Sequence, residues 1–244
     1  MTSFPITELR TREYPGRLEQ VLAGGSLFAQ GRLELLSQPG IGLCGSRDAS
    51  ASALEWAYEF GRKAAAQGVV VVSGYARGID RNAHRGVMEN GGSTIAVLPE
   101  GIQNFRIIRE FKNLVDLDSN FLAVSSFAPT AVWKSWRAMD RNKIIVGLSL
   151  GLFVIEARDK GGTINAALEC IRQKKRLWAV AYSEDTPGRE GNRKLLAGSA
   201  IPLEHLDQLG PALEDAMANP PPEVRQLVLN VTGEDTDHKR KAVS

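Results

Sequence analysis

The chain of 244 residues has few of the side chains that build metal centres or covalent cross-links. Two cysteines, Cys44 and Cys170, are too few for a disulfide framework or a four-cysteine zinc site. Three histidines leave little room for a histidine-rich metal centre, so we expect neither a metal nor another cofactor. The sequence has no run of 18 apolar residues and its N-terminus has no apolar signal core, so we expect a cytoplasmic protein without membrane contact.

Familiar catalytic and nucleotide-binding motifs are also missing. The sequence contains no G-x-x-x-x-G-K-[ST] phosphate loop, no G-x-G-x-x-G fingerprint after the first strand, no H-E-x-x-H and no G-x-S-x-G. These absences count against P-loop ATPases, dinucleotide dehydrogenases, zinc proteases and α/β-hydrolases. We therefore predict no catalytic residues and favour binding over catalysis. The net charge of +2 does not identify a partner, so any basic surface must come from local clustering.

The sequence does contain an alternation of short apolar runs and longer helical stretches. The runs are rich in Val, Ile and Leu, as in strands buried on both faces, and cover residues 41–44, 69–72, 94–98, 121–124, 151–155 and 177–180. Helices are predicted over residues 51–67, 78–90, 106–115, 136–146, 163–173 and 203–218. This alternation predicts a doubly wound α/β fold with a mainly parallel sheet and helices on both faces.

The two ends of the chain fall outside this alternation. Residues 1–40 are mixed in character, and we expect them to pack on the sheet edge as an N-terminal extension of a main domain over residues 41–218. Asn219 is followed by three prolines, which break regular structure. The remaining residues up to 244 are polar and charged and are expected to form a disordered tail.

Three glycine-rich loops follow predicted strands and lead into predicted helices, at residues 45–50, 73–78 and 156–163. Ligands of an open parallel sheet bind at the carboxyl ends of its strands, and the free N–H groups of a helix start favour anions. Arg47 adds a planar donor suited to phosphate. Asp80 and His84 lie one helical turn apart and are predicted to brace the second loop. The alternative is that the glycines serve the turns alone, with Ser50 as an N-cap and Arg47 on the surface.

Residues 133–143 combine basic and aromatic side chains. The segment holds four basic residues, one acid and two tryptophans, Trp133 and Trp136. Arg137 and Arg141 are four residues apart, so they share a helical face. Basic side chains can follow a phosphate backbone, and aromatic faces can stack on unpaired bases. The alternative is a charged surface helix whose tryptophans cover the core.

Taken in order, these segments resemble the DprA/Smf family of DNA-processing proteins. The most specific likeness is the second loop, which continues into Ala83 and His84. The first loop, residues 141–145 and residues 154–157 are similar to further family segments, and the resemblance covers about residues 14–200. The family glutamate of its S-E-x-P segment is absent from residues 125–129. We therefore expect a short or divergent member that consists of the core domain.

The resemblance implies an extended Rossmann-like domain that binds single-stranded DNA, forms a homodimer and loads a RecA-type recombinase during transformation. Carried over residue by residue, it implies DNA-phosphate contacts at Arg47, Arg141, Asn142 and Lys143. We expect further phosphate contacts from Arg77 of the second loop and Arg137 of the basic segment. It also implies that small residues shape the anion pocket, at Gly45, Ser46, Ser73, Gly74, Gly162 and Thr163. Lys143 replaces a family arginine, which keeps the charge but loses the bidentate fork.

Two other functions stay open. The pocket is also similar to that of lysine-decarboxylase-like (LOG) phosphoribohydrolases, so a nucleotide-binding or nucleotide-hydrolysing protein is the first alternative. Residues 161–163 with Glu169 partly match the P-G-G-x-G-T-x-x-E motif of those enzymes, without its proline and its G-T spacing. The second alternative is a DprA-like scaffold in a mobile-element or defence system, with Trp133 or Trp136 as a protein contact.

Overall fold

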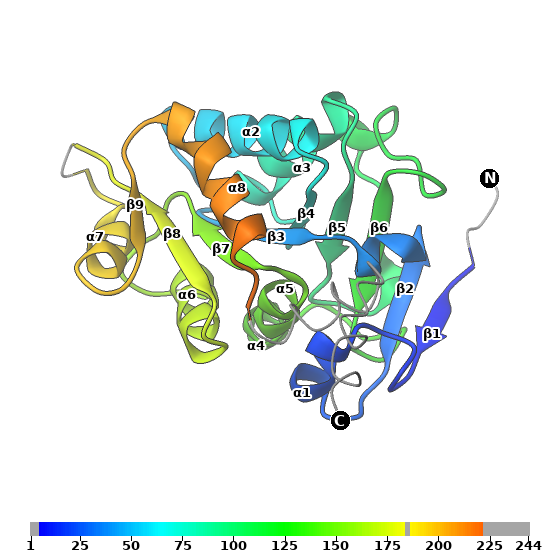
Figure 1. The fold of residues 1–244 in the computed structure, drawn as a ribbon. Coiled ribbons are helices and arrows are strands. Elements are labelled where there is room, and N and C mark those ends of the chain that lie inside the picture. Colours follow the sequence, from blue (N-terminus) through cyan, green and yellow to red (C-terminus); the bar gives the residue numbers. More distant parts are fainter. Residues whose placement is uncertain (1–4, 184–185, 222–244) are drawn as a thin grey trace, which may run out of the picture.

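The computed structural model describes residues 5–183 and 186–221. This part of the chain forms one nine-stranded sheet in the order β1-β2-β6-β5-β4-β3-β7-β8-β9 (Figure 1). The strands are β1 (Thr7–Leu9), β2 (Leu27–Gly31), β3 (Gly40–Cys44), β4 (Val70–Ser73), β5 (Thr94–Val97), β6 (Phe121–Ser125), β7 (Gly151–Val154), β8 (Arg176–Val180) and β9 (Ile201–Leu203).

The sheet is parallel from β6 to β9, and only the pairs β1–β2 and β2–β6 are antiparallel. From β3 the chain moves outward through β4, β5 and β6, and it then returns to the other side of β3 as β7. The strand order therefore reverses between β3 and β7. In doubly wound sheets, such a reversal opens a crevice at the carboxyl ends of the strands.

Helices cover both faces of the sheet, which confirms the doubly wound α/β prediction (Figure 1). They are α1 (Glu19–Leu22), α2 (Ala51–Ala66), α3 (Ile79–Glu89), α4 (Ser135–Asp140), α5 (Asn142–Leu148), α6 (Gly162–Arg172), α7 (Glu190–Leu196) and α8 (Leu209–Ala218). Short 3-10 turns are η1 (Gly16–Leu18), η2 (Leu33–Ser37), η3 (Ile102–Asn104), η4 (Arg109–Phe111) and η5 (Leu206–Gln208). None of the helices in the described ranges is both long and apolar enough to cross a bilayer.

Alternate residues of the central strands pack into two apolar cores, one on each face. Phe153 of β7 packs toward α2, and its ring centroid lies 4.9 Å from that of Phe60 on this helix. On the same face, its ring stacks on Trp178 of β8 at a centroid distance of 4.6 Å. The next residues of the same strand, Leu152 and Val154, belong to the core beneath α5 and α6. Strands buried on both faces need apolar residues at every position, which is why their runs are visible in the sequence.

The six predicted strands agree with the structure to within one or two residues at each end. The helix predicted over residues 106–115 is wrong, because that segment contains only the short turn η4. Its backbone is held by tertiary contacts instead: Ile108 N donates to the hydroxyl of Tyr75 at 3.2 Å, and Phe111 is anchored in the core. A segment of this length gains too little from its own hydrogen bonds to form a helix against such contacts.

Two further helices differ from their predicted ranges. The helix predicted over residues 136–146 is two helices, α4 and α5, which meet at Arg141. The helix predicted over residues 203–218 begins only at Leu209. Leu203 is instead the last residue of strand β9, where its carbonyl accepts a hydrogen bond from Ala181 N at 2.7 Å, and the 3-10 turn η5 precedes the helix. This tertiary pairing with the end of β8 outweighs the local helical pattern.

The N-terminal residues contribute β1 and β2, which extend the sheet beyond β6. Leu18, Leu27 and Leu35 from this segment are fully buried in the core on the α5 side. The division of the chain at residues 40 and 219 stays a prediction. The expected charged tail lies outside the described residues, which end at residue 221.

Candidate functional site

Three adjoining pockets open at the carboxyl ends of the parallel strands. The first pocket, of about 370 Å³, lies among α4 and the loops after β3 and β7. The second, of about 390 Å³, lies beside it at the loops after β4 and β5. The third, of about 780 Å³, lies between the loops after β3 and β7 and residues 186–190. The first two pockets adjoin because they share four lining residues, Arg47, Ala76, Trp133 and Arg141.

The structure brings together most of the residues predicted to form the phosphate site. Nine of them line the pockets: Gly45, Ser46, Arg47, Gly74, Arg77, Arg141, Asn142, Gly162 and Thr163. Three lie outside the lining: Ser73, Arg137 and Lys143. The Ser73 hydroxyl donates to the carbonyl of Leu43 at 2.7 Å, and the amine of Lys143 pairs with Asp140 at 2.9 Å.

Arg141 forms the floor between the first and second pockets. Its side chain is only 7% exposed, and Nη2 donates to the carbonyl of Gly74 at 3.3 Å. Asp80 Oδ2 lies 3.9 Å from Nη2, and Nε has no partner among the described residues. Burial lowers the pKa of Arg141, while the nearby Asp80 carboxylate opposes that shift. A guanidinium has five N–H donors, and among the described residues Arg141 uses only Nη2, on the Gly74 carbonyl and toward Asp80.

The glycine at position 74 is required by this arrangement. A Cβ atom built on Gly74 would lie 1.8 Å from Arg141 Nη2. Real side chains do not tolerate such a contact, so any larger residue would displace the guanidinium. Gly78, the N-cap of α3, has a φ of 79°, and a Cβ there would meet the carbonyl of Ser46 at 2.4 Å. These two glycines bring the second loop against the first loop and Arg141.

Asp80 and His84 lie on one face of α3 but contact different groups. Asp80 accepts a hydrogen bond from Ala76 N at 3.3 Å, and burial raises its pKa although Arg141 opposes the shift. His84 Nδ1 lies 2.7 Å from the hydroxyl of Thr94, which itself donates to the carbonyl of Val71. Nδ1 is therefore the protonated nitrogen. Burial lowers the pKa of His84 to about 3, so the ring is neutral.

The tryptophans of the basic segment are exposed, so the alternative that they cover the core is wrong. Trp133 is 49% exposed and Trp136 is 52% exposed. The guanidinium carbon of Arg47 lies 6.0 Å from the ring centroid of Trp133, at the boundary between the first two pockets. Arg137 packs on Trp136 with its guanidinium carbon 5.1 Å from the ring centroid. Aromatic surface is thus available beside the basic pockets.

Asn142 and Arg77 connect the loops around the first pocket. Asn142 Nδ2 donates to the carbonyl of Gly162 at 3.0 Å, which ties α5 to the start of α6. Arg77 Nη2 pairs with Asp48 Oδ1 at 2.7 Å and so joins the loops after β3 and β4. Asp48 N in turn donates a hydrogen bond to the Ser46 hydroxyl at 3.2 Å.

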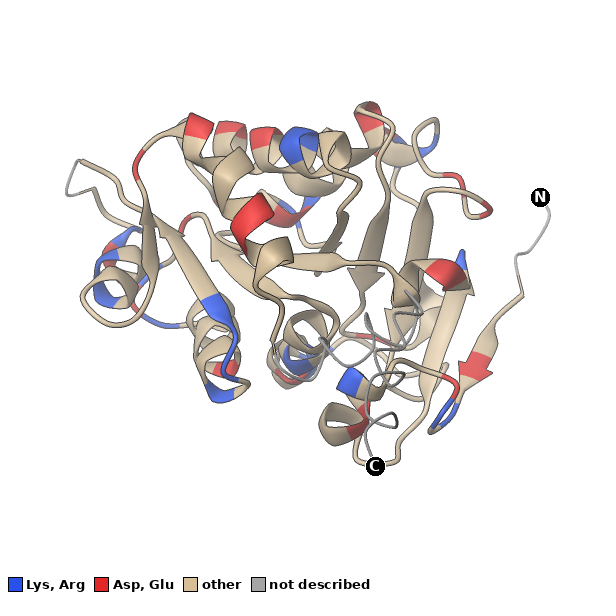
Figure 2. Ribbon diagram, viewed as in Figure 1, with Lys and Arg blue, Asp and Glu red and all other residues tan. Residues whose placement is uncertain are grey.

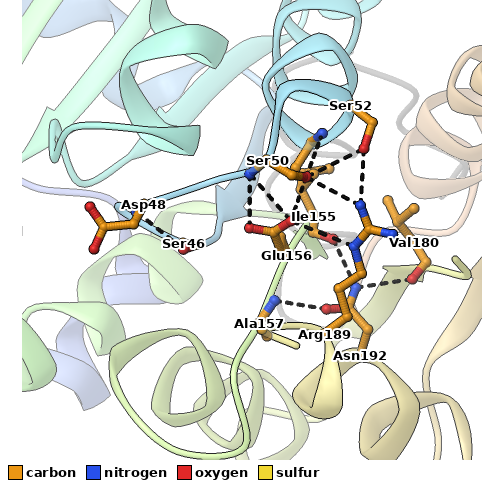
Figure 3. Close-up of polar contacts among 12 residues, drawn as sticks. Ser46, Asp48, Ser50, Ser52, Ile155, Glu156, Ala157, Val180, Arg189 and Asn192 are labelled. Carbon is orange, nitrogen blue, oxygen red and sulfur yellow. Dashed lines mark hydrogen bonds and ion pairs between the residues drawn. The ribbon is translucent and has the colours of Figure 1, made fainter. Parts of the chain in front are cut away.

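A closed polar network borders the third pocket (Figure 3). Glu156 accepts hydrogen bonds from Ser50 N at 3.2 Å and from the Ser50 hydroxyl at 2.6 Å. Arg189 Nε lies 3.7 Å from Glu156, and its Nη2 donates to the Ser52 hydroxyl at 3.1 Å. The Ser50 hydroxyl also accepts from Ala53 N, which confirms Ser50 as the N-cap of α2. Sequence reasoning missed Arg189, whose serine partners lie more than a hundred residues away.

The pockets differ in charge. Five arginines and one glutamate line the second pocket, including Arg81 and Arg106, which the sequence analysis missed. Three basic and four acidic residues line the third pocket. Away from this edge, α8 carries acidic residues, whereas α2 carries acidic and basic residues in equal number (Figure 2). The first and second pockets therefore form the part of this edge best suited to an anion.

Two features that bear on the alternative functions can be located in the described ranges. They contain no cluster of three or more His, Cys, Asp or Glu side chains that could hold a metal ion. Glu169, which matched the glutamate of the LOG motif, does not line any of the three pockets. Its carboxylate accepts a hydrogen bond from Arg172 Nε at 2.8 Å instead. The geometry therefore places Glu169 away from the pocket in which that motif would act.

Comparison with known proteins decides the family. The model of the family described as DNA recombination-mediator protein A matches residues 6–214. The chain belongs to the DprA/Smf family. Protein Smf of Escherichia coli is 31% identical over 211 residues, which are 84% of this chain and 54% of Smf. The chain thus spans about half the length of that DprA/Smf relative.

Solved DprA structures share the fold. DNA processing protein A of Streptococcus pneumoniae superposes with a TM-score of 0.74 at 27% identity, over 90% of this chain and 75% of that one. DNA processing protein A of Helicobacter pylori, known for a single-stranded DNA binding mode, also gives a TM-score of 0.74. It is 21% identical, and the match covers 87% of this chain and 97% of that one. The Rossmann-like fold of the DprA/Smf family is thereby confirmed.

Proposed function

We propose that this protein binds single-stranded DNA in the first and second pockets as part of DNA processing. The buried guanidinium of Arg141 carries this proposal, because it lines both pockets and its Nε has no partner among the described residues. A buried guanidinium whose donors are only partly satisfied gains from further acceptors, and a phosphate oxygen would supply them. Arg47 adds an exposed second guanidinium at the boundary between the two pockets.

Exposed aromatic rings support an unpaired strand as the ligand. Trp133 lines both pockets and is half exposed, so a base can stack on its free face. Stacking of a base on an aromatic side chain contributes about 1–3 kcal/mol, and the bases of a duplex are not available for it. The single-stranded DNA binding mode described for the Helicobacter pylori protein is consistent with this ligand.

Fluorescence anisotropy with a labelled oligothymidine and a duplex of equal length tests the proposal. We expect tighter binding of the single strand, with an affinity that falls as salt is raised because phosphate contacts release counterions. Arg47→Ala should weaken binding about tenfold, and the salt slope should fall by about 0.7 for one lost phosphate contact. Trp133→Ala should also weaken binding of the single strand.

The matched control is Arg62→Ala. Arg62 lies on α2, pairs with Glu59 at 2.7 Å and does not line any of the three pockets. Its variant should bind oligothymidine as the parent does. Equal affinities for Arg47→Ala, Arg62→Ala and the parent would overturn the assignment of the pockets.

We also propose that the protein forms a homodimer. Leu168 and Ile171 lie three residues apart on α6 and are 58% and 44% exposed, so they form an apolar strip on one helix face. Leu168→Asp should shift the mass measured by light scattering toward that of a monomer, and an unchanged mass would exclude this surface. A RecA-type recombinase partner, a role in transformation and a cytoplasmic location are proposed on the family resemblance alone.

A further inference from the structure

The second pocket contains one carboxylate that the proposed phosphate site does not use. Glu100 follows β5 and is the single acidic residue in the described lining of this pocket, beside five arginines. Two other carboxylates nearby are held by arginines: Asp48 by Arg77 and Asp80 by Arg141. Within the described ranges, no hydrogen bond or ion pair engages the carboxylate of Glu100. Only its backbone is fixed, by a hydrogen bond from the Ser125 hydroxyl to the Glu100 carbonyl.

An unengaged carboxylate in this position calls for a ligand that brings N–H donors. Burial raises the pKa of Glu100, and Arg106 opposes that shift without forming an ion pair. A phosphate placed against Glu100 would be repelled, because two anions would face each other. An N–H donor would instead satisfy oxygens that the pocket has partly removed from water.

Aromatic side chains contribute to the wall of the second pocket. Trp133 forms the boundary with the first pocket, and Tyr75 and Phe105 line it with ring centroids 5.5 Å apart. The hydroxyl of Tyr75 is fixed by the bond from Ile108 N. A volume of about 390 Å³ lies within the range of pockets that take small organic groups. A base can therefore enter while its phosphate lies on Arg47 or Arg141.

We infer that the second pocket reads a guanine ring through the carboxylate of Glu100. The Watson–Crick edge of guanine presents two adjacent donors, N1–H and an N2 amino hydrogen, which match the two oxygens of one carboxylate. Adenine, cytosine and thymine each present only one donor group on that edge, flanked by acceptors that a carboxylate repels. This inference rests on the proposed function, because the strand's phosphates place the base. A free guanine nucleotide offers the same edge, and the experiment separates the two sources.

The test compares 12-residue oligothymidines that carry one central guanine, adenine, cytosine or hypoxanthine. We expect the parent protein to bind the guanine strand about tenfold more tightly than plain oligothymidine, in line with one bidentate base contact. Hypoxanthine keeps N1–H but lacks the N2 amino group, so its strand should lose part of this advantage. Glu100→Gln should reduce the ratio of guanine-strand affinity to plain oligothymidine affinity from about ten to about one.

Glu110→Gln is the matched control, because Glu110 is an exposed residue of η4 that does not line any of the three pockets. It should keep the preference for guanine. Equal binding of all strands by the parent, or a preference that survives Glu100→Gln, overturns the inference and leaves the proposed function intact. Absence of single-strand binding altogether overturns both. Guanosine monophosphate that binds through Glu100 when no strand binds would assign the pocket to a free nucleotide and refute recognition within a strand.

Discussion

The two halves of the carboxyl edge are built from the same kinds of loops but use their charges in opposite ways. In the half beside β7 and β8, here called the closed half, Glu156 and Arg189 pair with each other and with serines at the start of α2. The half beside β4 and β5 is called the open half. Beside β4 and β5, five arginines and a single acid line the second pocket, and Arg77 and Arg141 are the two of these arginines that pair with carboxylates among the described residues. The first arrangement holds elements together, whereas the second leaves charge for a ligand.

This difference shows what a glycine-rich helix start does and does not indicate. The loops after β3, β4 and β7 look alike in the sequence, since each offers glycine and free N–H groups before a helix. In the structure the three loops differ in how many of their charged side chains form ion pairs within the protein. An incompletely neutralised buried cation such as Arg141 is therefore stronger evidence of an anion site than the loop itself.

The largest expected effect is a loss of stability on removing the Arg189–Glu156 ion pair of the closed half. Arg189→Ala leaves the buried carboxylate of Glu156 without its cation, so the free energy of unfolding should fall by about 3 kcal/mol. Urea denaturation measures this loss, and Lys194→Ala, which removes an exposed cation of α7, should change little. Affinity for oligothymidine should stay within about twofold in both variants. A stable Arg189→Ala protein that fails to bind DNA would reverse the roles assigned to the two halves.

A second prediction concerns the neutral histidine beneath the open half. His84 has a folded-state pKa of about 3, and an unfolded histidine has one near 6.5. Between these values the unfolded chain binds the additional proton, so the stability that His84 contributes is present above pH 6.5 and is lost as the pH falls. The loss amounts to about 1.4 kcal/mol per pH unit, or about 2 kcal/mol between pH 6.5 and pH 5.

Urea denaturation at pH 7.5 and pH 5.0 measures that loss. His84→Asn should show a smaller loss than the parent, because the variant no longer carries the titrating ring. Asp80 has a pKa raised by burial and titrates in both proteins, so the difference between them isolates His84. An equal loss in parent and variant would show that the imidazole is not held neutral by the fold.

The sequence predicts the scaffold better than it predicts the site. Central strands such as β4 and β7 are buried on both faces, so their positions are visible as continuous apolar runs. Parallel topology then brings the loops after them to one edge. The pairing of side chains within those loops depends on segments far apart in the chain, as with Arg141 and Gly74 or Arg189 and Ser52. Neither periodicity nor spacing records such contacts, so the charge difference between the two halves emerges only from the fold.

The cationic character of the open half can be tested at one of its newly identified residues. Arg106 lines the second pocket and is exposed. Arg106→Ala should weaken oligothymidine binding about fivefold at 0.1 M salt and reduce the salt slope by about 0.7. Lys194→Ala, which removes the same charge from the other half, should change neither quantity. Similar losses for both variants would mean that affinity follows the total charge rather than the second pocket.

The smallest expected effect is that of a substitution at Gly162, which lies in the loop region between the two halves. Gly162 begins α6 and lines the first pocket, yet a Cβ atom there would lie in open space with nothing within 4 Å. Gly162→Ala should therefore raise the free energy of unfolding by about 0.5 kcal/mol, because alanine loses less conformational entropy at a helical position. Its affinity for oligothymidine should stay within about twofold if the phosphates lie on Arg47 and Arg141. A tenfold loss would show that the strand passes directly over this backbone, and the path of the DNA would then extend toward the closed half.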